Sequence, residues 1–85
     1  MPGKRSSEIL ASLVAAALLK ERKRAGLTQE ALAARAGISW TYIHMIERGQ
    51  REPSFGVIEH LSDALGLRDP RRLFAGKLSK KGKPS

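Results

Sequence analysis

The chain has 85 residues, which is room for one small domain and not for a second core. Apolar residue types make up 41% of it, mostly Ala, Leu and Ile, and aromatic types only 5%, which favours packed helices over a β-sandwich or disorder. Sixteen Lys and Arg against eight Asp and Glu give a net charge of +8, so the expected partner is a polyanion, nucleic acid before an anionic membrane. The absence of Cys excludes disulfide frameworks, thiol catalysis and Cys-containing zinc sites, and it fits a cytoplasmic location.

Residues 1–6 are expected to form a flexible arm, and the first helix is expected to begin at Ser7 and to end at Gly26. The eleven residues Ile9 to Leu19 resemble the apolar core of a secretory signal, but they are too few to cross a bilayer. The basic run that follows them is also a poor neighbourhood for a cleavage site. We therefore expect an amphipathic helix and no membrane segment, with one face formed by Leu10, Leu13, Val14, Ala17 and Leu18.

Three further helices are predicted from paired cap residues. A Ser or Thr side chain accepts hydrogen bonds from the first free N–H groups of a helix, and Gly adopts the left-handed conformation that ends it. The predicted helices run from Thr28 to Gly37, from Ser39 to Gly49 and from Ser54 to Gly66. The last of them carries an apolar stripe formed by Ile58, Leu61 and Leu65.

A fifth, weaker helix is predicted to begin at Asp69-Pro70, because Pro suits the first helical position. It would carry Leu73, Phe74 and Leu78. The predicted fold is therefore all-α, a compact five-helix domain over residues 7–78, followed by a basic tail at residues 79–85.

The second and third predicted helices form the most informative segment, Thr28 to Gly49. They are short, and the connection across Gly37 has room only for a tight turn, which is the geometry of a helix-turn-helix. Ala33 is small where the second helix of the pair must cross close by. The residues expected to face the core are Leu32, Ala33, Ile38, Ile43 and Ile46.

This segment and its flanks resemble the lambda-type repressor and Cro class of helix-turn-helix DNA-binding proteins, the XRE family. The resemblance covers roughly residues 18 to 74, and it is carried by Arg22, Gly26 to Glu30, Leu32-Ala33, Gly37 to Ser39, Tyr42-Ile43, Ile46 to Gly49, Pro53 and Leu65 to Leu67. It implies a lambda-repressor-like fold and a transcriptional regulator that binds double-stranded DNA as a homodimer on a palindromic operator. The recognition helix, at about residues 39–48, would lie in the major groove. Thr41 to Ile43 with Ile46 to Arg48 look particularly like the small controller proteins of restriction-modification systems.

The resemblance also implies which residues face DNA. Gln29 is expected at the DNA backbone, next to free N–H groups that themselves favour phosphate. Tyr42 is expected near phosphate as well. The basic residues that flank the motif are also expected to contact phosphates, the alternative for each being a solvated charge: Lys20, Lys23, Arg24, Arg48 and Arg51. The start of the recognition helix would face the bases with Ser39, Trp40, Thr41, His44 and Met45, of which Trp40, Thr41 and Met45 offer mainly apolar surface that suits a thymine methyl.

Two structural roles complete the expected site. The resemblance implies that Arg22 pairs with Glu47 and so fixes the angle of the recognition helix, the alternative being two solvated charges. A dimer interface is expected after the fourth helix, because one recognition helix covers too few base pairs by itself. The expected interface residues are Leu67, Leu73, Phe74 and Leu78, the alternative being that Leu73 and Phe74 belong to the monomer core.

Other functional classes find less support. No nucleophile, acid and base pair or metal cluster stands at a recognisable spacing, so neither an enzyme nor a cofactor is expected. His44 and His60 are 16 residues apart with no third ligand in sight, so no metal site is expected either. The main alternative is an antitoxin-type module that binds a partner protein, with Trp40 as the anchor, and regulates its own synthesis through DNA. Nonspecific RNA binding is a third interpretation, but aromatic residues for stacking on bases are lacking.

Overall fold

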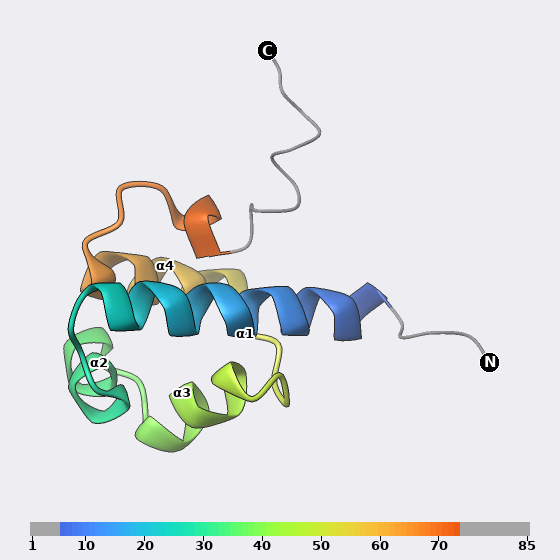
Figure 1. Cartoon of the computed structure of the whole chain (residues 1–85), viewed down its shortest axis with the longest axis horizontal. Helices are drawn as coiled ribbons and strands as arrows, with labels where there is room; N and C mark the ends of the chain where they lie inside the picture. The colour runs from blue at the N-terminus through green and yellow to red at the C-terminus, as the bar shows by residue number, and fades with distance from the viewer. Residues whose placement is uncertain (1–5, 74–85) are drawn as a thin grey trace, which may run out of the picture.

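The computed structural model describes residues 6–73, which form four α-helices and one turn of 3-10 helix (Figure 1). The elements are α1 (Ser6–Arg24), α2 (Gln29–Ala36), α3 (Trp40–Glu47), α4 (Phe55–Leu65) and η1 (Pro70–Leu73). Figure 1 shows α2 and α3 on one side of the long helix α1 and η1 on its other side. The helix α1 therefore lies between the helix-turn-helix pair and the C-terminal turn.

The starts of α2, α3 and α4 are capped by the three side chains that the sequence predicts. Thr28 Oγ1 accepts a hydrogen bond from the Ala31 N–H at 3.0 Å, and Ser39 Oγ accepts one from the Tyr42 N–H at 3.1 Å. Ser54 Oγ accepts one from the Val57 N–H at 3.2 Å. Each cap satisfies a backbone donor that has no partner inside its helix, so these boundaries follow from local chemistry.

The turn between α2 and α3 depends on the backbone of Gly37, which has φ 70° and ψ 32°. A side chain at this position would meet no heavy atom within 4 Å, so the need for Gly comes from the left-handed conformation and not from lack of space. The Gly37 N–H donates to the Ala33 carbonyl, and the next helix begins only three residues later at Trp40. The predicted helix-turn-helix geometry is confirmed.

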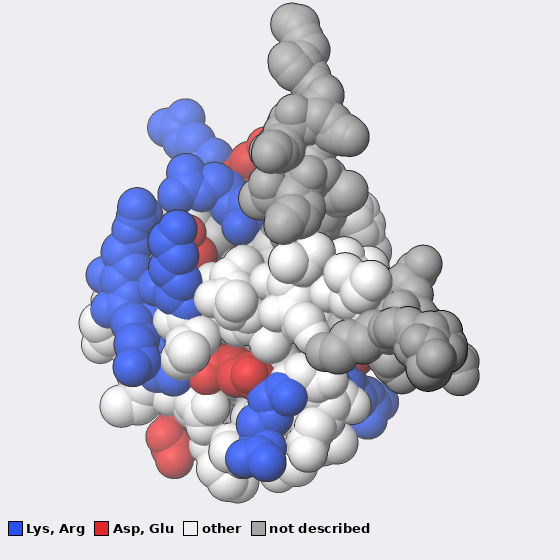
Figure 2. Space-filling view, turned by 45° about the vertical axis from the view of Figure 1, so that its right-hand side comes forward, with Lys and Arg blue, Asp and Glu red and all other residues white. Residues whose placement is uncertain are grey.

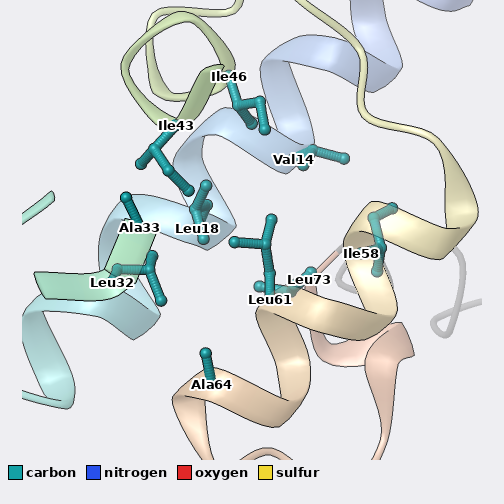
Figure 3. Packing of buried hydrophobic residues seen from close by; sticks show 10 residues of the cluster. All are labelled: Val14, Leu18, Leu32, Ala33, Ile43, Ile46, Ile58, Leu61, Ala64 and Leu73. Atoms are coloured by element: carbon teal, nitrogen blue, oxygen red, sulfur yellow. The ribbon is translucent and has the colours of Figure 1, made fainter. Parts of the chain in front are cut away.

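All five elements contribute to one apolar core (Figure 3). The four predicted inner residues Leu32, Ala33, Ile43 and Ile46 are buried, and Ile38 packs against them from the edge. Buried Ala33 brings α2 and α3 close together because its side chain is a single methyl. The complete cluster is Val14, Leu18, Leu32, Ala33, Ile43, Ile46, Ile58, Leu61, Ala64 and Leu73.

The helix α1 begins at Ser6, one residue before the expected cap. Its apolar run has a buried side, which includes Val14 and Leu18, and an exposed side, which includes Ile9 and Leu19. This is the amphipathic helix that the sequence predicts. No helix within residues 6–73 is both long and apolar enough to cross a membrane.

The prediction of a fifth α-helix is wrong over the residues that the structure describes. The chain makes one 3-10 turn, in which the Arg72 N–H donates to the Asp69 carbonyl at 3.0 Å. The Asp69 carboxylate accepts from the Arg71 N–H at 3.0 Å and pairs with the Arg71 guanidinium at 2.8 Å, which closes a tight local turn and lowers the pKa of Asp69. Phe74 and Leu78 lie outside the described residues.

Leu73 tests the importance of this turn for the core. Its side chain is completely buried, so Leu73→Ala is expected to lower the free energy of unfolding by about 2 to 5 kcal/mol through lost burial and a new cavity. The matched control is Leu19→Ala, because Leu19 is 37% exposed and the same change there should cost less than half as much. Urea unfolding followed by circular dichroism measures both, and equal losses would contradict a core role for Leu73.

Candidate nucleic-acid interface

Arg22 of α1 and Glu47 at the end of α3 form a two-pronged ion pair. Arg22 Nε donates to Glu47 Oε2 at 2.7 Å and Arg22 Nη2 donates to Glu47 Oε1 at 3.0 Å. The two side chains are only 12% and 5% exposed, and the hydrogen bonds to Glu47 raise the pKa of Arg22. A third donor, Arg22 Nη1, binds the Leu27 carbonyl at 2.9 Å. The guanidinium therefore fixes α3 and the loop before α2 to the same helix.

Gln29, the first residue of α2, connects this ion pair to the start of α3. Its Nε2 donates to Glu47 Oε1 at 2.9 Å, and its Oε1 accepts from Trp40 Nε1 at 3.1 Å. A carboxylate only accepts and an indole N–H only donates, so both contacts require the same orientation of the amide. One of the two amide hydrogens of Gln29 is therefore used by Glu47.

The same amide determines the tautomer of His44. Gln29 Oε1 lies 3.3 Å from His44 Nδ1, and a carbonyl oxygen cannot donate, so Nδ1 must carry the hydrogen. In the neutral ring, Nε2 then holds a lone pair and acts as an acceptor. His44 and Trp40 are also stacked, with ring centroids 5.2 Å apart and planes inclined by 23°.

The exposed start of α3 is consequently a rigid aromatic surface. Trp40 is 43% exposed, but its one polar atom is turned to Gln29. Thr41 beside it is exposed and Met45 is half-buried, while Ser39 serves as the helix cap. The part of α3 that the sequence assigns to base contacts presents mainly apolar atoms, which can touch a thymine methyl but cannot form a bidentate pair with a base.

Positive charge gathers where α3 ends. Arg48 follows the last helical residue and is exposed, and the Arg51 guanidinium lies 5.0 Å from the centre of the Tyr42 ring. This cation–π contact restrains the Arg51 side chain without neutralising its charge. Tyr42 and Arg51, both expected near phosphates, are therefore brought together by the fold.

The residues expected at a dimer interface are not brought together in the described part of the chain. Leu67 is half-buried and packs against the core of its own molecule. Leu73 is completely buried, so it belongs to the monomer core, which was the alternative to an interface role. Its backbone turn directs it into the cluster beside Leu61 (Figure 3). Phe74 and Leu78 lie beyond the described residues.

Two charged residues with a clear structural role were not predicted from the sequence. Glu21 is buried between the guanidinium groups of Arg24 and Arg72, and Arg35 donates to the Ala64 carbonyl at 3.4 Å. Glu21 stands inside the run KERKR, where every neighbour suggests a solvated surface, so no local signal marks it as buried. Within residues 6–73, no three His, Cys, Asp or Glu side chains are grouped so as to hold a metal ion.

Comparisons with known proteins agree with this geometry. Residues 18–73 match the family model described as helix-turn-helix. The chain is 40% identical over 55 residues to the uncharacterized HTH-type transcriptional regulator y4dJ of Sinorhizobium fredii, covering 65% of this chain and 71% of that one. Such an identity over most of both chains supports a shared fold along the whole motif.

Two solved structures are similar as well. The restriction-modification controller protein C.AhdI from Aeromonas hydrophila superimposes with a TM-score of 0.77 at 34% identity, over 82% of this chain and all of that one (100%). An HTH_3 family transcriptional regulator from Vibrio cholerae gives a TM-score of 0.79 at 26% identity over 85% of this chain. This chain spans only 40% of the Vibrio protein, so that comparison concerns one of its parts.

A double-mutant cycle tests the ion pair. Arg22→Ala or Glu47→Ala leaves one mostly buried charge without its partner, and each is expected to lower the free energy of unfolding by roughly 2 to 4 kcal/mol. The double variant should lose clearly less than the sum of the two. Denaturant unfolding measures all four proteins, and strict additivity would mean that the two side chains do not interact.

The tautomer of His44 gives a second prediction. At a pH where the ring is neutral, nitrogen NMR is expected to show a protonated Nδ1 and an unprotonated Nε2, because Gln29 Oε1 only accepts. Gln29→Ala should remove this restriction and shift His44 toward a mixture of tautomers. His60, exposed on α4, is the internal control that should not change. A protonated Nε2 in the unaltered protein would refute the deduced contact.

Proposed function

The chain belongs to the helix-turn-helix family of DNA-binding transcriptional regulators, and we propose that it acts as a homodimer on a palindromic operator, with α3 in the major groove. The observation that carries this proposal is the fixed position of α3. Arg22 and Gln29 hold its last residue, Glu47, while its first turn stays exposed.

The contacts suggest that different residues of α3 and its flanks bind bases and phosphates. Trp40, Thr41 and Met45 are proposed to touch thymine methyl groups, and His44 to support Trp40 by stacking. Tyr42, Arg48 and Arg51 are proposed to bind phosphates, together with the second amide hydrogen of Gln29, while Ser39 caps α3 at the edge of the base-facing surface. Phosphate contacts would supply most of the affinity and place α3 in register, whereas the apolar contacts would supply the base preference.

Dimer formation is supported by the size of the recognition surface. A single helix of eight residues reads only a few base pairs, whereas two copies related by a two-fold axis read two half-sites about 34 Å apart, one turn of DNA. The likeness to C.AhdI, over all of that chain, supports the narrower possibility of a controller protein in a restriction-modification system.

The test is selection of bound duplexes from a random pool with the full chain. One consensus with two inverted half-sites, whose centres are about 34 Å apart, is expected from paired reading helices. Sedimentation of the complex should give two chains for each duplex. A consensus without symmetry, held by one chain, would contradict the dimer, and the absence of any consensus would contradict sequence-specific binding.

The selected duplex also tests the apolar reading surface. Replacing thymine by deoxyuridine removes only the C5 methyl group. Burying one such carbon group contributes about 0.8 kcal/mol, so the loss of each contacted methyl should weaken binding about fourfold. Trp40→Ala should bind the two duplexes more equally than the unaltered protein. Thr41→Ala should likewise reduce the difference in affinity between the two duplexes, for the thymine that Thr41 contacts. Arg51→Ala is the control, and it should weaken binding to both duplexes alike. Equal sensitivity to deoxyuridine in all four proteins would contradict this assignment.

A further inference from the structure

A second group of basic residues is left unused by the proposed operator contacts. It consists of Lys20, Lys23 and Arg24 at the end of α1 and of Arg68, Arg71 and Arg72 in and before η1, all six exposed, and we call it the basic ridge. Figure 2 shows Lys and Arg gathered down one side of the molecule. The two segments are more than 40 residues apart in the sequence, so only the fold brings these charges together.

Glu21 is the residue that joins the two halves of the ridge. Its carboxylate lies 3.7 Å from Arg24 Nη1 and 3.6 Å from Arg72 Nη2, and its side chain is only 6% exposed. The side chains of Arg24 and Arg72 remain 57% and 51% exposed above it. The buried carboxylate therefore holds two guanidinium groups side by side at the surface and leaves their outer N–H groups to solvent.

The centre of the basic ridge, around Glu21, faces away from the recognition helix α3. Glu21 and Arg22 are neighbours in α1, and successive helical residues point about 100° apart. Arg22 contacts Glu47 of α3, whereas Glu21 contacts Arg72 of η1. Since α3 and η1 lie on opposite sides of α1 (Figure 1), a straight duplex placed along α3 would pass on the far side of α1 from Arg72.

The chemistry of the ridge fits a phosphate backbone better than a protein. Within residues 6–73, the carboxylates that form ion pairs with these six cations are those of Glu21 and Asp69. The six side chains are long and can follow a row of phosphates. Protein interfaces have an apolar centre, often aromatic. Of the four large apolar side chains that are exposed among the described residues, only Leu19 borders the ridge.

We propose that the basic ridge binds the phosphate backbone of a second DNA duplex while α3 holds the first, so that the protein links two DNA segments. This binding is independent of base sequence, because the ridge offers only charge to the backbone. It goes beyond the proposed operator recognition, which concerns the opposite side of α1.

The test is a capture experiment. A duplex with the selected palindrome is immobilised and loaded with protein, and a fluorescent duplex of unrelated sequence is then added at low salt. The test variant is Lys20→Gln with Lys23→Gln and Arg68→Gln, which leaves both partners of Glu21 and the partner of Asp69 in place. It is expected to capture about tenfold less of the second duplex and to hold the first within about twofold, because three phosphate contacts are lost from the ridge alone.

The matched control keeps the charge at the same positions, with Lys20→Arg, Lys23→Arg and Arg68→Lys, and should capture as much as the unaltered protein. Equal capture by the Gln variant would overturn the proposal, because the second duplex would then be held elsewhere, for instance by the other reading helix of a dimer. Loss of the first duplex together with the second would also overturn it. Capture of poly-glutamate but not of DNA would point instead to an acidic protein.

Failure of the proposed function gives a different result, in which the unaltered protein does not prefer the selected duplex over other DNA. The ridge is then measured by direct titration of the unrelated duplex with the same pair of variants. Weaker binding by the Gln variant alone would support the ridge, and equal binding by both would overturn it. Thermal melting by circular dichroism confirms that both variants are folded.

Discussion

The carboxylate of Glu47 is the point at which α1, α2 and α3 are held in one arrangement. Its Oε1 accepts from Arg22 Nη2 and Gln29 Nε2, and its Oε2 accepts from Arg22 Nε. A carboxylate that is only 5% exposed is costly to bury, and three charge-assisted hydrogen bonds offset much of that cost. Both hydrogen bonds between Arg22 and Glu47 have to align, so the arrangement favours one crossing angle of α3. Because α3 is already held in place, less conformational entropy is lost when DNA binds.

Two adjacent residues of α1 divide the molecule into two charged surfaces. Arg22 is a mostly buried cation that organises the acidic end of α3, and Glu21 is a buried acid that organises the cations of α1 and η1. Each of these buried charges pairs with a charge on another element, so the ion pairs tie α3 and η1 to α1 as well as satisfying the charges. Residues 6–73 contain ten Lys and Arg and eight Asp and Glu, so much of the excess positive charge of the chain lies in its two ends.

The parts of the fold that depend on local chemistry could be predicted from the sequence. The caps at Thr28, Ser39 and Ser54 and the left-handed turn at Gly37 are decided within a few residues of themselves. The prediction of a fifth α-helix was wrong because Pro70 indicates where a helix can begin and not how far it continues. Leu73 could not be assigned either, since an apolar residue after the last long helix suits a core and an interface equally well.

The charged contacts were harder to predict because they join distant residues. Arg22 and Glu47 are 25 positions apart, and their pairing was expected only from a family resemblance, since no spacing rule connects them. The contacts of Gln29 with Trp40 and His44 were missed for the same reason, as was the burial of Glu21. In each case the identity of the partner depends on the crossing of two helices, which exists only after the core has formed.

The use of the Trp40 N–H inside the protein limits how sequence can be read. An indole that donates to Gln29 has no polar atom left for a base edge, so in the proposed complex Trp40 would contribute to base choice through apolar contact. One methyl contact discriminates less than a bidentate hydrogen-bonded pair, which contributes about 1 to 3 kcal/mol. A regulator with this reading surface needs several weak contacts, repeated in two half-sites or supplemented by DNA shape, to reach a useful preference over bulk DNA. The rigid attachment of Trp40 and His44 to α2 serves that need, because small apolar contacts contribute only when the surfaces meet in register.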